Sequence, residues 1–583
     1  MNNAPDIAAM TSQERDRRVL ELCEQVSEIE QRLIPTGLHV FGRATDGREC
    51  ADMLRMVASF DRPEVGARSL PDLVAEGLGF DASHLFHTST IKDEAMLRTR
   101  EQVDVVVREV ISIFIEDGVE RAVSWLGHAA HVTGEASRPV LMLLERIREQ
   151  LKSNQELDSL MRALRGEYIA PGPGADIVQN PGILPTGRNT HAVNPYKVPS
   201  EAAFTRAERV VNLLLKRHRA EHGRYPHAMA LVLWGLDNIK TEGEGVAQAL
   251  WLLGVRPVRD AMNRATEIEL IPLDVLGRPR VDVVMTVSGI FRDLFGATMN
   301  LLDKAVRAVA ALDESVESNY VRRHVDAQMK DEGVSFDEAA LRVFSNAPGN
   351  YGTNVNFMVM DSQWDSSSAL GDLFVTRKCF AYGRDGEGRM VEGREARGAM
   401  NRALANVEAT YQNIDSFEIG ITDVDHYFEY LGGVSKAVEK QSQARPAIYL
   451  SDGLSMETKV RSLEETVRLE TRAKTLNPKW YEGMLAHGFR GVAEIENHVV
   501  NTFGWSATTG AVDDWIYTEV AETFVLNEGM LERLRHLNPH SARSLVARLL
   551  EAQGRGFWQA EREVIERLRE VFAGLEDQLE GVV

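Results

Sequence analysis

Apolar residues recur every three or four positions from about residue 12 to residue 165, as at Val19, Leu22 and Val26. This spacing places the apolar side chains on one face of a helix. The pattern predicts a mainly helical domain over residues 1–170.

Proline and glycine interrupt the helical pattern in the stretch that follows, PGPGADIVQNPGILPTGRNTHAVNP. Proline cannot continue a helix, and it pushes the residue before it towards extended backbone. We expect an ordered linker rich in proline and glycine over residues 171–200.

Strand patterns and helix patterns alternate over residues 201–345. The expected strands are MALVLWG, EIELIPL and RVDVVMTV, and the expected helices include GVAQALWLLG and IFRDLFGATMNLLDKAVRAVAAL. Strands that alternate with helices are typical of a parallel sheet. This part is therefore predicted to be a Rossmann-like α/β domain.

A second α/β segment is expected over residues 346–456, with a strand-like stretch, FEIGITDV, and a strand, PAIYL. Residues 457–583 have an almost entirely helical pattern. The predicted fold class is thus multidomain α/β, with a helical N-terminal region, one or more Rossmann-like parallel α/β domains and a helical C-terminal region.

Composition narrows the function classes. The 583 residues include 66 Lys and Arg against 87 Asp and Glu, a net charge of -21 that disfavours nucleic acid and anionic membrane surfaces as partners. There is no apolar run of the ~20 residues that span a bilayer, and the first residues resemble no secretion signal. The three cysteines, Cys23, Cys50 and Cys379, form no C-x-x-C pair. We expect a cytoplasmic protein without a transmembrane segment.

One segment, GILPTGRNT at 182–190, nearly matches the phosphate-binding loop G-x-x-x-x-G-K-[ST]. Arg188 replaces the lysine, Asn189 replaces the hydroxyl residue, and Pro195 prevents the helix that has to follow. We therefore expect that any ATP is hydrolysed by another subunit.

Polar residues follow the expected strand MALVLWG, and they include Asp237 and Lys240. The next segment, GEGVAQ, lacks the last glycine of a dinucleotide fingerprint because Gln248 occupies that position. The two glycines of this segment are better explained as part of an ordinary turn between a strand and a helix. The region still lies beyond the carboxyl end of a strand, where open α/β sheets bind ligands.

His218 and His222 have the spacing of metal ligands on one helix face. They also stand among cations in the last turn before Gly223, where positive charge complements the helix dipole. The second explanation is the simpler one.

The segment ITDVDHYFEYLGG at 421–433 is the strongest local cluster, with Asp423, Asp425, His426 and Glu429 expected directly after a strand. Carboxylates beside an imidazole can exchange protons near neutral pH and can ligate a divalent ion. The alternative is a helix start that is capped by Asp423. From spacing alone the two interpretations are equal.

Arg292 stands early in the helix that follows the strand RVDVVMTV. A guanidinium there can clamp a carboxylate of a ligand with two hydrogen bonds. It can equally form a structural ion pair with Asp293 or Asp282.

Several long phrases together resemble one family. They are LPTGRNTHAVNP, ALVLWGLDNIKTEGEGVAQALWLLGVRPV, SGIFRDLF, RVFSNAPGNYGTNVN, TLNPKWYEGMLAHGFRGVAEIENHVVNTFGWSATTGAVDDWIY and EAQGRGFW. They are similar to the C-terminal part of the large, porphyrin-binding H subunit of magnesium chelatase, a relative of the large cobaltochelatase subunit.

The resemblance implies insertion of Mg²⁺ into protoporphyrin IX in (bacterio)chlorophyll synthesis, with ATP hydrolysed by AAA+ partner subunits of the I and D types. It makes Asp423 and His426 the catalytic candidates, and it makes Asp423, Asp425 and Glu429 the candidate ligands of the substrate Mg²⁺. The candidate porphyrin-binding residues are Arg188, His191, Asp237, Lys240 and Arg292.

The family's large subunit is longer, and its upstream half carries a segment of the type H-G-S-x-E-F-x-P-G that this sequence lacks. The expected partners therefore include a separately encoded upstream half and the Mg-protoporphyrin methyltransferase. Two alternatives stay open. One is a non-catalytic tetrapyrrole carrier or regulatory scaffold, and the other is a large subunit of the cobaltochelatase type in cobalamin synthesis.

Overall fold

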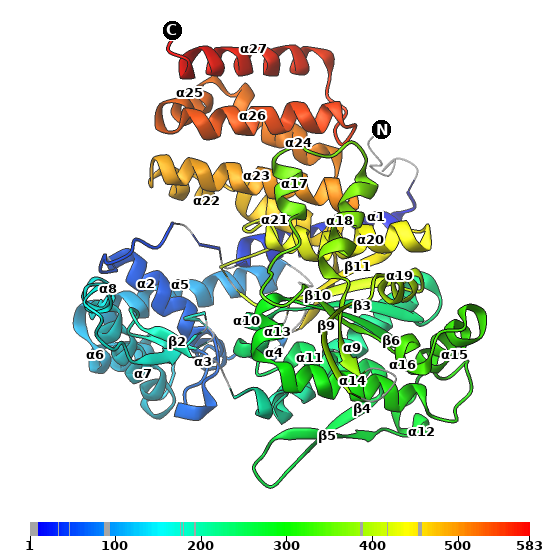
Figure 1. Ribbon diagram of the computed structural model, residues 1–583. Coiled ribbons are helices and arrows are strands. Elements are labelled where there is room, and N and C mark those ends of the chain that lie inside the picture. The colour runs from blue at the N-terminus through cyan, green and yellow to red at the C-terminus, as the bar shows by residue number, and fades with distance from the viewer. Residues whose placement is uncertain are drawn as a thin grey trace. The chain divides into compact units, whose positions relative to one another are not determined.

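The computed structural model describes residues 10–32, 34–35, 37–45, 47–86, 94–174, 176–178, 180–191, 194–384, 389–416, 418–452 and 458–582. The chain forms two compact units, one of Met1–Pro35 with His39–His191 and the other of Thr36–Leu38 with Ala192–Val583 (Figure 1). Within the described residues, no helix is both long enough and apolar enough to cross a membrane.

The first unit is helical, as the sequence predicts. Its core includes Phe114, Leu126 and Leu144, which are fully buried. A short parallel pair of strands, β1 (Pro171–Pro173) and β2 (Asn189–His191), lies in the segment rich in proline and glycine. The helices are α1 (Ser12–Gln31), α2 (Gly47–Ala58), α3 (Leu70–Gly77), α4 (Ala82–Phe86), α5 (Glu94–Asp117), α6 (Val119–Ala129), α7 (Gly134–Lys152) and α8 (Glu156–Leu164), with short turns η1 (Pro63–Val65) and η2 (Pro181–Ile183).

The second unit is built on a sheet in which the described residues form eight strands, in the order β12-β11-β10-β3-β6-β7-β8-β9. The five central strands, β11 to β7 in this order, are parallel. They are β3 (Ala228–Leu233), β6 (Asp282–Val287), β7 (Val343–Ser345), β10 (Ala409–Ile414) and β11 (Ala447–Asp452). The edge strands β8 (Phe380–Arg384), β9 (Met390–Glu395) and β12 (Lys459–Ser462) are antiparallel.

Every residue of β3 and of β6 is buried. Because successive side chains of a strand point to opposite faces, this pattern means that both faces of the sheet are covered, as in parallel α/β sheets. The parallel centre confirms the predicted fold class. The antiparallel edges are a difference from the purely parallel sheet that we expected.

Two predicted strands have a different outcome. The stretch EIELIPL supplies β5 (Ala265–Leu270), which pairs with β4 (Val255–Arg259) in a separate antiparallel hairpin. The stretch FEIGITDV is not a strand in its described residues, and the strand before the acidic cluster is β10, which ends at Ile414. The backbone N–H groups of Ile421 and Thr422 are bound by a buried carboxylate instead of a neighbouring strand.

Helices connect the strands and cover the sheet. They are η3 (Pro195–Lys197), α9 (Glu201–His222), α10 (Gly235–Lys240), α11 (Glu244–Leu253), α12 (Leu273–Leu276), α13 (Gly289–Leu294), α14 (Gly296–Ala310), α15 (Tyr320–Glu332), α16 (Phe336–Ala339), α17 (Val355–Met360), α18 (Ser367–Lys378), α19 (Arg397–Ala405), η4 (Phe428–Gly432) and α20 (Gly433–Ser442).

The C-terminal part is helical, as predicted, and Figure 1 shows α23, α26 and α27 stacked on one another. Its elements are α21 (Leu463–Glu470), η5 (Thr471–Thr475), α22 (Pro478–Leu485), α23 (Phe489–Thr509), α24 (Asp514–Ala521), η6 (Glu522–Leu526), α25 (Glu528–Leu537), α26 (Pro539–Gly554) and α27 (Arg562–Leu579).

A buried ionic cluster fixes the start of β6. Arg342 binds Asp282 through Nε at 2.9 Å and through Nη2 at 3.0 Å, and His324 Nδ1 lies 2.8 Å from Asp282 Oδ2. Burial alone would raise the pKa of the Asp282 carboxyl, but the charge of Arg342 and the contact with His324 together outweigh it and lower the pKa to about 2. Asp282 is thus paired with Arg342 and not with Arg292.

Replacing Arg342 by methionine (R342M) leaves the buried carboxylate of Asp282 with His324 but without its arginine counter-charge. We expect a loss of about 3–5 kcal/mol in the free energy of unfolding, measured by chemical denaturation. R562M, on the exposed face of α27, is the control and should have no measurable effect. In the wild-type protein the contribution of Asp282 is present above about pH 4 and is lost as the pH falls towards 2. A loss below 1 kcal/mol in R342M would contradict this account.

Candidate functional site

The predicted acidic cluster lies between β10 and α20, on the side of the sheet where the central parallel strands end. The chain enters α20 through a π-helical turn, η4 (Phe428–Gly432). Such a turn holds one residue more than an α-helical turn and is frequent at functional sites. Another π-helical turn, η5, comes from the C-terminal part and supplies Lys474 to the same region.

His426 is the exposed member of the cluster. Its side chain is 61% exposed, its Nδ1 lies 3.0 Å from Oε2 of Glu429, and it lies 3.6 Å from Oδ1 of Asp425. The hydrogen bond with Glu429 is the main reason that the pKa of the His426 imidazole is raised above its ordinary value. An oriented imidazole with one open face can accept a proton.

Glu429 is the buried member that orients this imidazole. Its Oε1 accepts hydrogen bonds from Thr353 N, from Asn354 N at 3.0 Å and from Thr353 Oγ1 at 3.1 Å. Burial would raise the pKa of Glu429, but the hydrogen bonds from His426 and Thr353 outweigh it and lower the pKa. The carboxylate is therefore held as an anion behind the imidazole.

Asp425 and Trp234 both lie near His426. Asp425 Oδ2 accepts a hydrogen bond of 2.6 Å from Asn356 Nδ2, and its carboxylate is partly exposed. The half-buried Trp234 ring packs on Tyr430 with ring centroids 4.4 Å apart and lies 6.2 Å from the His426 ring. The site thus combines a base, a partly exposed carboxylate and an aromatic surface.

Asp423, predicted to act with His426, has a different environment. Its Oδ2 accepts hydrogen bonds from Lys474 Nζ and from Gly420 N, and its Oδ1 lies 3.1 Å from His498 Nε2. Burial would raise its pKa, but the charges of His498 and Lys474 lower the pKa well below its ordinary value. The Asp423 carboxylate is thus bound by these two side chains and does not cap the helix start.

The backbone around Asp423 is fixed by buried groups of the C-terminal part. Glu470 accepts hydrogen bonds from the N–H groups of Ile421 and Thr422, at 2.9 Å each. Trp505 Nε1 donates to the Ile421 carbonyl, and Asn501 donates to the Thr422 carbonyl. Sequence reasoning missed Lys474, Glu470 and His498, because no spacing links them to residue 423. The only signal in the sequence was their position: His498 lies in the longest phrase that resembles the family, and Glu470 and Lys474 come just before that phrase.

The predicted metal ligands Asp423, Asp425 and Glu429 are not assembled as a site. Within the part of the chain that the structure describes, no three His, Cys, Asp or Glu side chains are placed to hold a metal ion together. The physical reason is that Asp423 is bound by Lys474 and Glu429 by Thr353. Of the three side chains, that of Asp425 is the most exposed.

Asp237 and Lys240 are found beside this region, at the carboxyl end of β3, as the sequence predicts for their position. Lys240 Nζ binds Asp415 Oδ2 at 3.0 Å, and Asp237 Oδ2 accepts a hydrogen bond of 3.3 Å from Asn413 Nδ2. Burial, then the charges of Asp415 and Glu244, raise the pKa of Asp237 well above its ordinary value. The buried Oδ1 of Asp237 has no hydrogen-bond partner among the described residues.

Arg292 forms the structural ion pair with Asp293 that was one of the two alternatives for this residue. Its guanidinium binds Asp293 Oδ1 at 2.7 Å and donates to the carbonyls of Ala347 and Asn350, at 2.8 Å each. Nearby, Lys378 is fully buried and donates to the Val287 carbonyl at 2.9 Å. Burial lowers the pKa of Lys378 well below its ordinary value. No pattern in the sequence pointed to this lysine.

Arg188 and His191 belong to the first unit and are described separately. The Arg188 guanidinium donates to the carbonyls of Ile183 at 2.8 Å and Leu184 at 3.2 Å. The loop that resembles a phosphate-binding motif thus presents carbonyl oxygens to its own arginine. The backbone of His191 pairs with Pro173, and its side chain lies outside the described atoms.

Replacing Asp423 by asparagine (D423N) removes the counter-charge of Lys474 and His498 without changing the shape of the side chain. We expect a loss of about 3–5 kcal/mol in the free energy of unfolding by chemical denaturation. The exposed H426Q variant should leave the stability within about 0.5 kcal/mol. Equal stabilities of the two variants would contradict the structural role of Asp423.

Comparison with known proteins places the chain in a family. The family model "CobN/Magnesium Chelatase" matches residues 2–565. The chain is 43% identical to the chloroplastic magnesium-chelatase subunit ChlH of Oryza sativa subsp. indica, over 98% of this chain and 43% of that protein. It is 44% identical to the H subunit of the magnesium chelatase of Cereibacter sphaeroides, over 74% of this chain and 36% of that protein.

A solved structure agrees with the sequence matches. The catalytic subunit of cobaltochelatase from Mycobacterium tuberculosis superposes with a TM-score of 0.89 at 32% identity, over 97% of this chain and 47% of that one. The chain spans less than half the length of these proteins, and its correspondence to their C-terminal part stays a prediction from the sequence. The extent and the level of these matches show that the chain belongs to the CobN/magnesium chelatase family.

Proposed function

We propose that the chain is the part of a magnesium chelatase large subunit that accepts protons during insertion of Mg²⁺ into protoporphyrin IX. AAA+ partner subunits hydrolyse the ATP, and the product enters (bacterio)chlorophyll synthesis. The observation that carries the proposal is the exposed imidazole of His426, which the buried carboxylate of Glu429 holds at 3.0 Å in a chain of this family.

The reaction needs a base and a path for a hard cation. Mg²⁺ gives up its water ligands reluctantly, and each porphyrin has to lose two pyrrole protons when the ion enters. His426 accepts a proton, and the anionic Glu429 stabilises the imidazolium that forms. Asp425, 3.6 Å from His426, offers an oxygen ligand to the entering ion.

Trp234 supplies a surface for the macrocycle. Aromatic rings stack on flat π-systems, and the Trp234 ring lies next to the imidazole that has to reach the pyrrole nitrogens. Asp237 and Lys240 lie in the next helical turn, α10, which begins directly after Trp234. We propose that α10 forms one wall of the porphyrin site.

Cobalt insertion is the second candidate. It is supported by the likeness to the cobaltochelatase subunit, with a TM-score of 0.89. The higher identity to the two subunits named for magnesium, 43% and 44% against 32%, supports magnesium as the metal of this chain.

The base can be tested in a chelatase that is reconstituted from this chain, the remaining part of a relative's large subunit and its AAA+ subunits. H426Q should lower kcat about 10²- to 10⁴-fold, because the proton acceptor is lost. In the wild-type enzyme the rate should rise with pH through the His426 pKa, which lies above the ordinary value of about 6.5. E429Q removes the charge that raises this pKa, so the rising limb should move to lower pH.

The matched control is H536Q, which changes an exposed histidine on α25 and should leave the rate and its pH profile unchanged. Deuteroporphyrin binding, followed by fluorescence, shows whether each variant still takes up the macrocycle. Full activity of H426Q, or an E429Q profile that does not move, would reject His426 as the base. Tight porphyrin binding without activity in any reconstitution would favour a carrier.

The metal can be tested in the same reconstituted enzyme. With Mg²⁺ and protoporphyrin IX we expect a metalloporphyrin product, detected by its absorption spectrum. With Co²⁺ and a corrinoid precursor we expect no product. The reverse result would assign the chain to cobalt insertion.

A further inference from the structure

A cavity lies in the same unit, at the ends of the parallel strands opposite to the candidate site. It has a volume of about 610 Å³, and loops that precede β3, β10 and β11 line it together with α9 and α15. Since β3 has six residues, the two ends of this strand, one beside the cavity and one beside the candidate site, lie about 20 Å apart. None of the residues that we assign to proton transfer lines this cavity.

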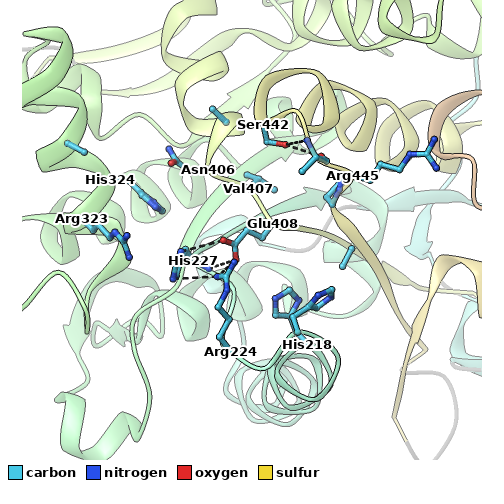
Figure 2. A pocket seen from close by; sticks show the side chains of 16 residues that line it. His218, Arg224, His227, Arg323, His324, Asn406, Val407, Glu408, Ser442 and Arg445 are labelled. Atoms are coloured by element: carbon cyan, nitrogen blue, oxygen red, sulfur yellow. Dashed lines mark hydrogen bonds and ion pairs between the residues drawn. The ribbon is translucent and has the colours of Figure 1, made fainter.

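The cavity is positively charged, although the protein carries a net charge of -21. Its lining contains four histidines and three arginines, and Glu408 is its only acidic residue among those described. Figure 2 shows Arg323 and His324 of α15 next to His227 and Arg224. Cavities of this size commonly hold small ligands.

The arginines differ in what they already bind. Arg224 Nη1 binds Glu408 Oε2 at 2.8 Å, and Arg445 Nε binds Glu439 Oε1 at 3.1 Å. Arg323 is exposed, and no hydrogen bond or ion pair joins its guanidinium to another described residue. A cation without a partner in a concave surface is free to bind a ligand.

Two of the four imidazoles of the cavity, those of His227 and His218, have pKa values below the ordinary one. Burial lowers the pKa of His227, and the charges of Arg224 and Arg323 lower it further, against the opposing effect of Glu408. Burial, together with His222, lowers the pKa of His218 to about 4. His324 uses Nδ1 to bind Asp282, which leaves its Nε2 for the cavity.

A metal ion is a poor occupant. In the described part of the chain, no three His, Cys, Asp or Glu side chains are placed to share a metal ion, and the four histidines of this cavity are no exception. Two arginines beside the imidazoles also repel a cation. An anion, in contrast, is attracted by the guanidinium of Arg323, which has no carboxylate partner among the described residues.

We propose that this cavity binds a small anion, a phosphoryl or carboxylate group, between Arg323 and Arg224, with His227 and His324 as hydrogen-bonding neighbours. Guanidinium groups bind both kinds of oxyanion with paired, charge-assisted hydrogen bonds. The site is separate from the proton-transfer site and does not depend on the metal that the enzyme inserts.

Isothermal titration of the whole chain with inorganic phosphate and, separately, with malonate tests the proposal at constant ionic strength. We expect saturable binding of at least one of them. R323Q should weaken this binding about tenfold or more, the usual effect of losing a charge-assisted hydrogen bond. Because Arg323 has no partner among the described residues, R323Q should unfold like the wild-type protein.

R562Q is the matched control, since it removes one positive charge from an exposed helix of the same unit and should leave the affinity unchanged. Binding of phosphate alone, or of malonate alone, supports the site and identifies the group that it prefers. Absence of saturable binding of both anions, or equal affinities of R323Q and R562Q, would overturn the proposal.

Discussion

A carboxylate that is buried away from water needs hydrogen-bond donors from the protein. This requirement determines the structure of the loops at the C-terminal ends of the parallel strands. Glu429 takes its donors from Thr353 and Asn354, and Glu470 takes its donors from Ile421 and Thr422. Each carboxylate joins segments that are far apart in the sequence. The position of His426 is a consequence, because its ring rests on one of these fixed anions.

The elements of the fold could largely be predicted from the sequence, because periods of 3.6 and 2 are local properties of the chain. The helical regions and β3, β6 and β11 follow from such patterns. The loop at 418–424 could not be predicted, since its apolar residues have the alternation of a strand. What overrides that pattern is Glu470, about 50 residues away, which binds the backbone N–H groups that a strand would use.

The site could be predicted only in part, because local spacing shows some of its contacts and not others. It predicted that His426 and Glu429 lie close together, since they are three residues apart on one helical turn. It could not separate Asp423 from them, because Lys474 and His498, which neutralise Asp423, come from other helices. The choice between a catalytic and a structural carboxylate therefore depends on tertiary contacts that no local pattern contains.

The π-helical turn η4 has a consequence for sequence variation in the family. It holds one residue more than an α-helical turn between His426 and α20. A π-helical turn and an α-helical turn both complete about one rotation, so removing the extra residue would restore an α-helical turn and leave α20 facing α18 almost as before. The side chains within 428–432 would be displaced instead, and Glu429, which binds Thr353 from this turn, is among them. A deletion at these positions should therefore spare the packing of α20 and disturb the carboxylate that holds His426.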